Sequence, residues 1–214
     1  MSHWVTKFSN DLAPDMVEIF SRPDALVEQG SIIKDDKSTT VAKYKHNNQQ
    51  FIIKRFNARN SGHAVKRSLR KSRARNCWDI SDVFLKSGLL VAQPIAVLET
   101  RFGILKGNSY FVSNYINGDE LLHWLPKQDS SMQSLVAKKI QEAFIILSEK
   151  RIAHGDMKAT NLLWSETHQN IVFIDLDVAK QHKNQLLFER AHLRDKRRFS
   201  RNGDFFKKII SENN

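Results

Sequence analysis

The sequence has a single cysteine, Cys77, so no disulfide can form within the chain. Its absence of paired cysteines is typical of proteins that work in a reducing compartment. No apolar run is long enough to cross a bilayer, and no basic segment followed by an apolar one opens the chain. We therefore expect neither a transmembrane helix nor a secretory signal peptide, and a cytoplasmic location.

Acidic residues are outnumbered. The chain has 23 Asp and Glu against 34 Lys and Arg, which gives a formal net charge of +11. Such an excess favours a polyanionic partner: nucleic acid, anionic lipid headgroups or a phosphorylated glycolipid. With 41% hydrophobic and 27% charged residues over 214 positions, the chain can bury a core, either as one domain or as two small lobes.

One stretch, 152–164, combines a polar loop with apolar flanks, and the apolar strand 171–174 follows it after a short gap. Within these segments Asn161 follows Asp156 by five residues, and Asp175 comes directly after the strand. This order of His-x-Asp, Asn and a second Asp is the signature of the protein-kinase catalytic loop and metal site. A bare His-x-Asp arises often by chance, in a polar turn before an ordinary strand, but the whole constellation does not.

Phosphoryl transfer explains why these residue types are needed, because the protein has only to align a hydroxyl and neutralise a polyphosphate. Asp156 would accept the proton of the attacking hydroxyl. Asn161 and Asp175 offer hard oxygen ligands to Mg²⁺. Lys158 could reach the γ-phosphate as a point charge. His154 is expected to hold the loop by hydrogen bonds.

The first third of the chain predicts paired strands over 30–44 and 50–56, with a turn at 46–49. The hairpin tip 35–38 lacks the Gly-x-Gly-x-x-Gly pattern. A phosphate cradle there would depend on backbone N–H groups and on hydroxyls such as those of Thr39 and Thr40, and a plain hairpin is the alternative. Lys54 ends the run 51–53 and is our candidate for the α- and β-phosphates; the alternative is an ordinary edge-strand lysine.

Further elements follow from periodicity and turn signals. We expect a short helix over 9–20, a mostly helical segment over 61–86, a hairpin of 103–105 with 110–112 across 106–108, and an amphipathic helix over 131–150. Asn114, Tyr115 and Ile116 fall where a kinase has its hinge, so adenine would bind there. No Glu occurs between Glu28 and Glu99. A kinase needs an acid in this region to fix its lysine, so Asp79 or Asp82 would serve, or Lys54 is held otherwise.

The segments 154–164 and 174–177 closely resemble the bacterial lipopolysaccharide kinases, the 3-deoxy-D-manno-octulosonic acid (Kdo) and heptose kinases of the inner core. The glycine-poor hairpin 34–41 and the basic segments 72–75 and 194–199 are also similar. The resemblance implies a protein-kinase-like fold, ATP with Mg²⁺, and a sugar hydroxyl acceptor on a membrane glycolipid. The chain departs from the family in lacking a Glu near Cys77.

We therefore predict an α+β, two-lobed protein-kinase-like fold, with an extension (1–29) that packs on a β-rich N-lobe (30–116) and a mainly helical C-lobe (117–214). The predicted function is a kinase of the lipopolysaccharide core at the cytoplasmic face of the inner membrane, in peripheral contact with anionic lipid. Nucleic acid is not the expected partner. Four arginines are candidates for binding the anionic acceptor: Arg70, Arg73, Arg197 and Arg198. The alternatives are a small atypical protein serine/threonine kinase and a non-catalytic kinase-like scaffold.

Overall fold

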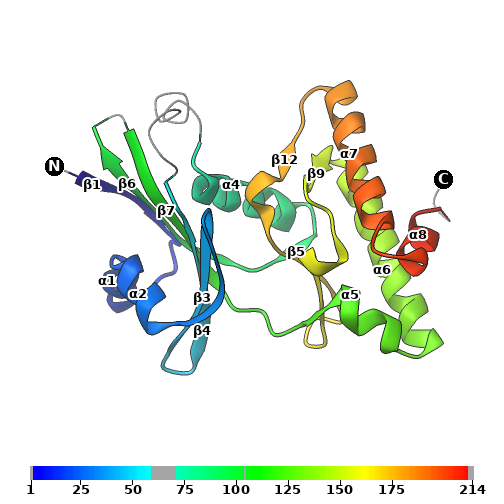
Figure 1. Cartoon of the computed structure of the whole chain (residues 1–214), viewed down its shortest axis with the longest axis horizontal. Coiled ribbons are helices and arrows are strands. Elements are labelled where there is room, and N and C mark those ends of the chain that lie inside the picture. Colours follow the sequence, from blue (N-terminus) through cyan, green and yellow to red (C-terminus); the bar gives the residue numbers. More distant parts are fainter. Residues whose placement is uncertain (1, 59–70, 104, 212–214) are drawn as a thin grey trace. The chain divides into compact units, whose positions relative to one another are not determined.

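The computed structural model describes residues 2–58, 71–103 and 105–211. The chain forms two compact units, which are described separately (Figure 1). The first unit comprises Met1–Asp79 and Gln93–Tyr115, and the second comprises Ile80–Ala92 and Ile116–Asn214. The chain thus passes finally into the second unit between Tyr115 and Ile116, within the segment expected to be a hinge.

The first unit is built on a six-stranded antiparallel sheet. In spatial order its strands are β1 (Ser2–Phe8), β6 (Pro94–Phe102), β7 (Leu105–Asn114), β4 (Gln49–Phe56), β3 (Thr39–His46) and β2 (Ser31–Asp36). The expected β3–β4 hairpin is confirmed, with Val41 opposite Lys54. Its turn contains Asn47 at a positive φ of 52°, a conformation that Asn tolerates better than most residues.

One expectation for this sheet was wrong, and one strand was not foreseen. The reversal between β6 and β7 falls at Gly103, which has a φ of +59°, and not at 106–108. Gly107 and Asn108 lie inside β7, where the Asn108 side chain accepts a bond of 2.8 Å from the Ala58 N–H. Strand β1 was not predicted at all. It pairs along its whole length with β6, so tertiary pairing decides its conformation.

Two short helices cover part of this sheet, α1 (Pro14–Phe20) and α2 (Pro23–Gln29) (Figure 1). The expected helix over 9–20 therefore begins later, at Pro14, and Pro23 begins a second helix, as proline's fixed φ allows. Phe20 is fully buried and meets Phe51 of β4 edge-on, with ring centroids 5.0 Å apart. These helices thus complete the apolar core of the first unit.

The second unit is organised around α6 (Ser130–Glu149), close to the helix predicted over 131–150. Asp129 caps it by accepting a 2.8 Å bond from the Met132 N–H. The helix is amphipathic, as expected, and its buried residues are Val136, Ile140, Ala143, Phe144 and Leu147. A small sheet in the order β5 (Leu90–Val91), β11 (Asn170–Phe173), β10 (Leu162–Ser165) and β8 (Asp119–Glu120) joins the same core.

Several short elements connect these parts: α5 (Leu121–Trp124), η2 (Leu125–Lys127), β9 (Ile152–Ala153), η3 (Ala159–Asn161), η4 (Leu176–Val178) and β12 (Lys180–Gln181). Helices α7 (Gln185–Ser200) and α8 (Asp204–Ser211) complete the second unit and lie beside α6 (Figure 1). Helix α4 (Arg73–Lys86) begins in the first unit and ends in the second. Residues 61–70 of the helix expected over 61–86 lie outside the described residues. Among the described helices, none has the length and apolar character needed to span a membrane.

Candidate active site

Helix α7 holds the loop between β9 and β10 through hydrogen bonds. Asp195 is buried in that helix, and its two carboxylate oxygens accept from the Gly155 N–H at 3.1 and 3.0 Å. Gly155 has a φ of +82°, and a Cβ placed there would lie 2.8 Å from the Val178 carbonyl oxygen. The loop therefore requires glycine at this point both for its backbone angle and for its close contact with η4.

Asp156 is the most heavily engaged side chain of this loop. Its Oδ2 accepts from Lys158 Nζ at 3.0 Å and from Asn161 Nδ2 at 3.3 Å. Its Oδ1 accepts from Arg198 Nη1 at 2.7 Å, and the same nitrogen donates to the Gly155 carbonyl oxygen at 2.7 Å. Three side chains from two separate segments thus fix the carboxylate, as a positioned base requires.

Asn161 and Asp175 lie at the same end of the β10–β11 hairpin. Leu162 pairs with Phe173, and the Ile174 N–H donates to the Asn161 carbonyl oxygen at 3.0 Å, so Asp175 follows immediately. Asn161 Nδ2 also donates to the Asp156 carbonyl oxygen at 2.8 Å, so the Asn161 Oδ1 points away from Asp156. Asp175 has left-handed backbone angles, φ 60° and ψ 52°, which are strained for most residues and frequent at functional sites.

His154 links these groups from inside the core. It is fully buried, and its Nε2 lies 3.0 Å from the Ile174 carbonyl oxygen, so Nε2 carries the proton and donates. Burial lowers the pKa of His154, while the negative charges of Asp195, Asp175 and Asp156 act in the opposite direction. All three carboxylates therefore lie within electrostatic reach of one imidazole, and the expected structural role of His154 agrees with this arrangement.

The donor set fits a magnesium ion carried by a nucleotide. Mg²⁺ commonly takes one or two protein ligands and completes its shell with phosphates and water. Asn161 offers an amide oxygen and Asp175 a carboxylate at adjacent positions of the hairpin. Within the described residues there is no cluster of three or more His, Cys, Asp or Glu that could bind a metal without such help.

In the first unit, two cationic side chains approach one aromatic ring. Lys54 Nζ lies 5.3 Å from the centroid of the Phe56 ring, and Arg73 Cζ lies 4.5 Å from it. Arg73 Nη1 also donates to Thr39 Oγ1 at 3.2 Å. The predicted nucleotide lysine and one predicted acceptor arginine therefore lie together beside the β2–β3 hairpin.

The hydroxyls of Thr39 and Thr40 face protein. Both residues are 2% exposed, and Thr40 Oγ1 donates to Asp35 Oδ1 at 2.7 Å. Asp36 accepts from the N–H groups of Ser38 and Thr39 and from the Ser38 hydroxyl, and these bonds hold its pKa well below the usual range. The two threonine hydroxyls and the N–H groups of Ser38 and Thr39 are therefore all engaged within the protein, and a phosphate at this hairpin would have to displace one of these bonds.

At the expected hinge, two backbone donors are already used. The Asn114 N–H donates to the Gln93 carbonyl oxygen at 3.0 Å, and the Tyr115 N–H donates to the Gln50 carbonyl oxygen at 2.9 Å. Lys43 Nζ lies 3.7 Å from the centroid of the Tyr115 ring. Adenine recognition at this segment would then rest on carbonyl oxygens and on the N–H of Ile116.

Two acidic residues, Asp79 and Glu99, lie near the start of α4, where a kinase would place the Glu that this sequence lacks. Asp79, one suggested substitute, bonds Lys71 at 2.8 Å and lies 3.5 Å from Arg75. The buried Glu99 accepts from the Ser72 hydroxyl and, at 2.9 Å, from Arg101. Ser72 Oγ in turn accepts from the Arg75 N–H at 3.0 Å, so Glu99 fixes the start of α4.

Sequence reasoning missed Asp195, one of the two α7 residues that contact the loop. Asp195 is an acid in a basic segment, and that contrast was the available signal. Arg198 was expected to bind an acceptor, which stays a prediction, and the structure shows that it contacts Asp156. Arg197, its neighbour, points elsewhere and lines a hollow beside α6 and α8. Arg70 lies outside the described residues.

One curated protein is similar to part of this chain in sequence. Part of the chain is 28% identical over 78 residues to the EKC/KEOPS complex subunit bud32 of Dictyostelium discoideum, a match that covers 34% of this chain and 31% of that protein. The chain therefore spans about a third of the length of this curated relative.

Two solved structures are similar. WaaP in complex with acyl carrier protein aligns with a TM-score of 0.70 at 13% identity, covering 97% of this chain and 89% of WaaP. The kinase PK-1 of the Cydia pomonella granulovirus aligns with a TM-score of 0.47 at 15% identity, over 78% of this chain and 58% of that one. The likeness to WaaP shows a kinase-like fold, with a β-rich N-terminal sheet and a helical C-terminal part, as predicted.

A family model described as "Protein kinase domain" matches residues 37–193, which is most of the chain and includes every residue of the loop and hairpin around Asp156 and Asp175. Members of such a family use ATP as the phosphoryl donor, typically with Mg²⁺. The chain belongs to the protein kinase domain family.

Proposed function

We propose that this protein is an ATP-dependent kinase that phosphorylates a sugar hydroxyl of the lipopolysaccharide inner core, on Kdo or heptose. The observation that supports catalysis most directly is the fixed carboxylate of Asp156, which accepts from Lys158, Asn161 and Arg198. The acceptor class is supported by the resemblance of 154–164 and 174–177 to lipopolysaccharide kinases.

Asp156 would take the proton of the attacking hydroxyl. A carboxylate oxygen has two acceptor positions. Oδ2 accepts from Lys158 and Asn161, whereas Oδ1 accepts only from Arg198 among the described residues. The second position on Oδ1 is therefore the one available to the sugar hydroxyl, and Arg198 beside it would orient the carboxylate toward that hydroxyl.

The remaining residues serve the nucleotide. Bound Mg²⁺ supplies charge neutralisation on the phosphates. Asn161 and Asp175 would hold it, and Lys158 would bind the γ-phosphate. In the first unit, Lys54 would bind the α- and β-phosphates, backbone groups near Thr39 and Thr40 would assist, and the segment 114–116 would bind adenine.

The excess of positive charge supports an anionic acceptor and peripheral contact with an anionic membrane at the cytoplasmic face of the inner membrane. In the first unit, Arg73 lies beside the β2–β3 hairpin and is our candidate for an acceptor phosphate. The solved WaaP structure is a complex with acyl carrier protein. This favours a protein partner for the present chain too.

The second candidate function is a protein serine/threonine kinase. It is favoured by the local sequence match to bud32, a subunit of a multiprotein complex. The same loop residues would carry the reaction, and only the acceptor would differ. A third reading, a non-catalytic scaffold, would have no need of the fixed Asp156 carboxylate.

Radiolabelled ATP separates these candidates when it is supplied with Kdo-lipid A, with heptosylated core lipid, or with casein as a generic protein. Transfer to either glycolipid that is lost in Asp156→Asn supports the proposal. Transfer only to protein would reject the acceptor and leave the kinase. Absence of transfer to any acceptor, with ATP raising the melting temperature equally with and without Mg²⁺, would favour the scaffold.

A further inference from the structure

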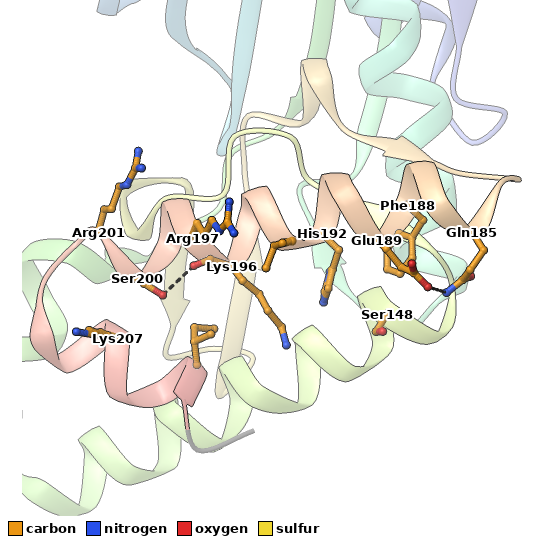
Figure 2. A pocket seen from close by; sticks show the side chains of 12 residues that line it. Ser148, Gln185, Phe188, Glu189, His192, Lys196, Arg197, Ser200, Arg201 and Lys207 are labelled. Atoms are coloured by element: carbon orange, nitrogen blue, oxygen red, sulfur yellow. Dashed lines mark hydrogen bonds between the residues drawn. The ribbon is translucent and has the colours of Figure 1, made fainter. Parts of the chain in front are cut away.

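A hollow of about 600 Å³ lies among α6, α7 and α8 of the second unit (Figure 2). It is separate from the catalytic loop. At 3.6 residues per turn, Asp195 and Arg198 share the side of α7 that contacts the loop, whereas Lys196 and Ser200 lie on another side and line the hollow. The phosphotransfer chemistry proposed above does not use this surface, so its composition needs its own explanation.

The hollow is strongly cationic. Its lining includes four basic side chains: Lys196, Arg197, Arg201 and Lys207. Its one acid, Glu189, accepts a 2.8 Å bond from Gln185 Nε2 on the same helix. Arg197, Arg201 and Lys207 are exposed, and none of them forms an ion pair with a carboxylate in the part of the chain that the structure describes.

His192 lines the hollow, and its pKa reflects the positive charge nearby. Its ring packs against Phe188, with centroids 5.1 Å apart, and against Phe144 at 5.9 Å. Burial lowers the pKa of His192, and the positive charge of Lys196 lowers it further. Figure 2 shows both side chains extending from α7 toward α6. An anion bound here would face a cationic surface with few competing acids.

Apolar groups accompany the charges. Phe188 and Ile210 form a buried floor, and Leu193 at the rim is 48% exposed. Leu186, seven residues earlier on α7, is 65% exposed and lies on the same side of the helix as Leu193. The surface is therefore a groove with apolar contacts along a helix and basic residues beside them.

We propose that this groove binds an acidic amphipathic helix from a protein partner. Such a helix would place its apolar side on Leu186, Leu193 and Ile210 and its carboxylates near Arg197 and Lys207, which is the helix-in-groove mode of recognition. Helix α7 has 16 residues and is about 24 Å long, enough to support three to four turns of a partner helix.

Two other anionic partners fit the surface less well. A membrane is bound by basic side chains that protrude from a convex amphipathic face, whereas Lys196, His192 and Ser200 are half-buried within a hollow. Single-stranded RNA is bound by exposed aromatic rings on which bases stack. Phe188 is 2% exposed, and the His192 ring is already packed against Phe188 and Phe144.

The test uses the full chain and a fluorescein-labelled 18-residue peptide with Glu on one helical face and Leu on the other. Comparison probes are a scrambled peptide of the same composition, vesicles containing phosphatidylglycerol, and a 20-nucleotide RNA, all at about 50 mM salt. We expect a saturable increase in fluorescence anisotropy with the amphipathic peptide and with none of the comparison probes. The double variant Arg197→Glu with Lys207→Glu should weaken it about tenfold.

A matched control has the same change in net charge away from the groove, Lys127→Glu with Lys138→Glu, both exposed positions that do not line the hollow and have no ion pairs among the described residues. It should bind the peptide within about twofold of the parent chain. Circular dichroism checks that both variants are folded. Equal weakening in the two variants, equal binding of the scrambled peptide, tighter binding of vesicles or RNA, or no binding of any probe would each overturn the proposal, whatever the kinase assay gives.

Discussion

Nη1 of Arg198 donates at 2.7 Å both to Oδ1 of Asp156 and to the carbonyl oxygen of Gly155. This contact joins α7 to the catalytic loop across 42 residues of sequence. The Arg198 side chain is 46% exposed and the Asp156 side chain 27% exposed, so solvent reaches the pair. We therefore expect this contact to matter mainly by orienting Asp156, the proposed base, since exposed ion pairs contribute little to stability.

Arg198→Ala should lower kcat about tenfold and leave KM for ATP within about twofold. A positioned base contributes 10²–10⁴ to such reactions, and the loss of one orienting contact should remove only part of that. Arg198→Lys should recover part of the rate because an ammonium can still donate to Oδ1. Steady-state kinetics check this. The exposed Arg194, one turn earlier on α7, provides the control Arg194→Ala, and an equal loss there would contradict the role of Arg198.

Asp195→Ala should destabilise the protein by about 1–3 kcal/mol. The variant leaves the Gly155 N–H, which now donates to both oxygens of the buried carboxylate, without its acceptor. For a chain of this length, that corresponds to a melting temperature lower by about 2–12 °C. Asp195→Asn keeps an acceptor and should lose less. Thermal unfolding followed by circular dichroism measures both, and equal losses would mean that the hydrogen bond is not the cause.

Gly155→Ala should lower both stability and activity, although it adds only one methyl group. A residue with a Cβ at φ +82° costs about 1–2 kcal/mol, and the added carbon would also lie 2.8 Å from the Val178 carbonyl oxygen. Gly88→Ala is the matched control, since Gly88 has a φ of +80° and open space around its Cβ position. We expect both variants to lose stability and only Gly155→Ala to lose activity as well. Normal activity in Gly155→Ala would show that the loop tolerates displacement.

Local features were predictable from the sequence, and contacts between distant segments were not. The β3–β4 hairpin and helix α6 follow from alternation and helical spacing, which depend on neighbouring residues. The adjacency of Asn161 and Asp175 follows from one short hairpin. The contacts of Asp195 with Gly155 and of Arg198 with Asp156 depend on how α7 packs, and no spacing rule encodes that.

The misplaced turn has a different cause. The segment 103–108 contains two glycines, Gly103 and Gly107, and either could have supplied a reversal. Gly103 has the positive φ, and the pairing of Arg101 with Lys106 then places Gly107 inside the strand. Strand β1 was missed because its conformation depends on pairing with β6, and the sequence of an edge strand carries a weak signal.

Asn161→Ala should raise the Mg²⁺ concentration needed for half-maximal activity, by about tenfold. The change removes one proposed metal ligand and also the two bonds that Nδ2 donates to the Asp156 carbonyl and carboxylate oxygens. A second readout is independent of turnover: the rise in melting temperature that ATP causes should shift to higher Mg²⁺. An unchanged Mg²⁺ dependence of both quantities would exclude Asn161 as a ligand.

Stability should fall as the pH is lowered below about 6.5, and His192 should contribute to this loss. Burial, together with Lys196, lowers the pKa of His192 in the folded protein below its ordinary value of 6.5. Below pH 6.5 the unfolded chain therefore binds a proton that the folded chain resists, so acid favours unfolding. The stabilising effect of the neutral ring is complete above pH 6.5 and is lost as the pH falls toward the folded pKa.

His192→Phe should reduce that acid sensitivity, because a phenyl ring can pack against Phe144 and Phe188 without binding a proton. The measurement is the melting temperature at pH 7.5 and pH 5.5 for the parent chain and the variant. His123, whose side chain is 75% exposed, provides the control His123→Gln. The drop between the two pH values should shrink for His192→Phe and stay unchanged for His123→Gln. Buried His154 and partly buried His182 also have lowered pKa values, so some acid sensitivity should persist in both variants.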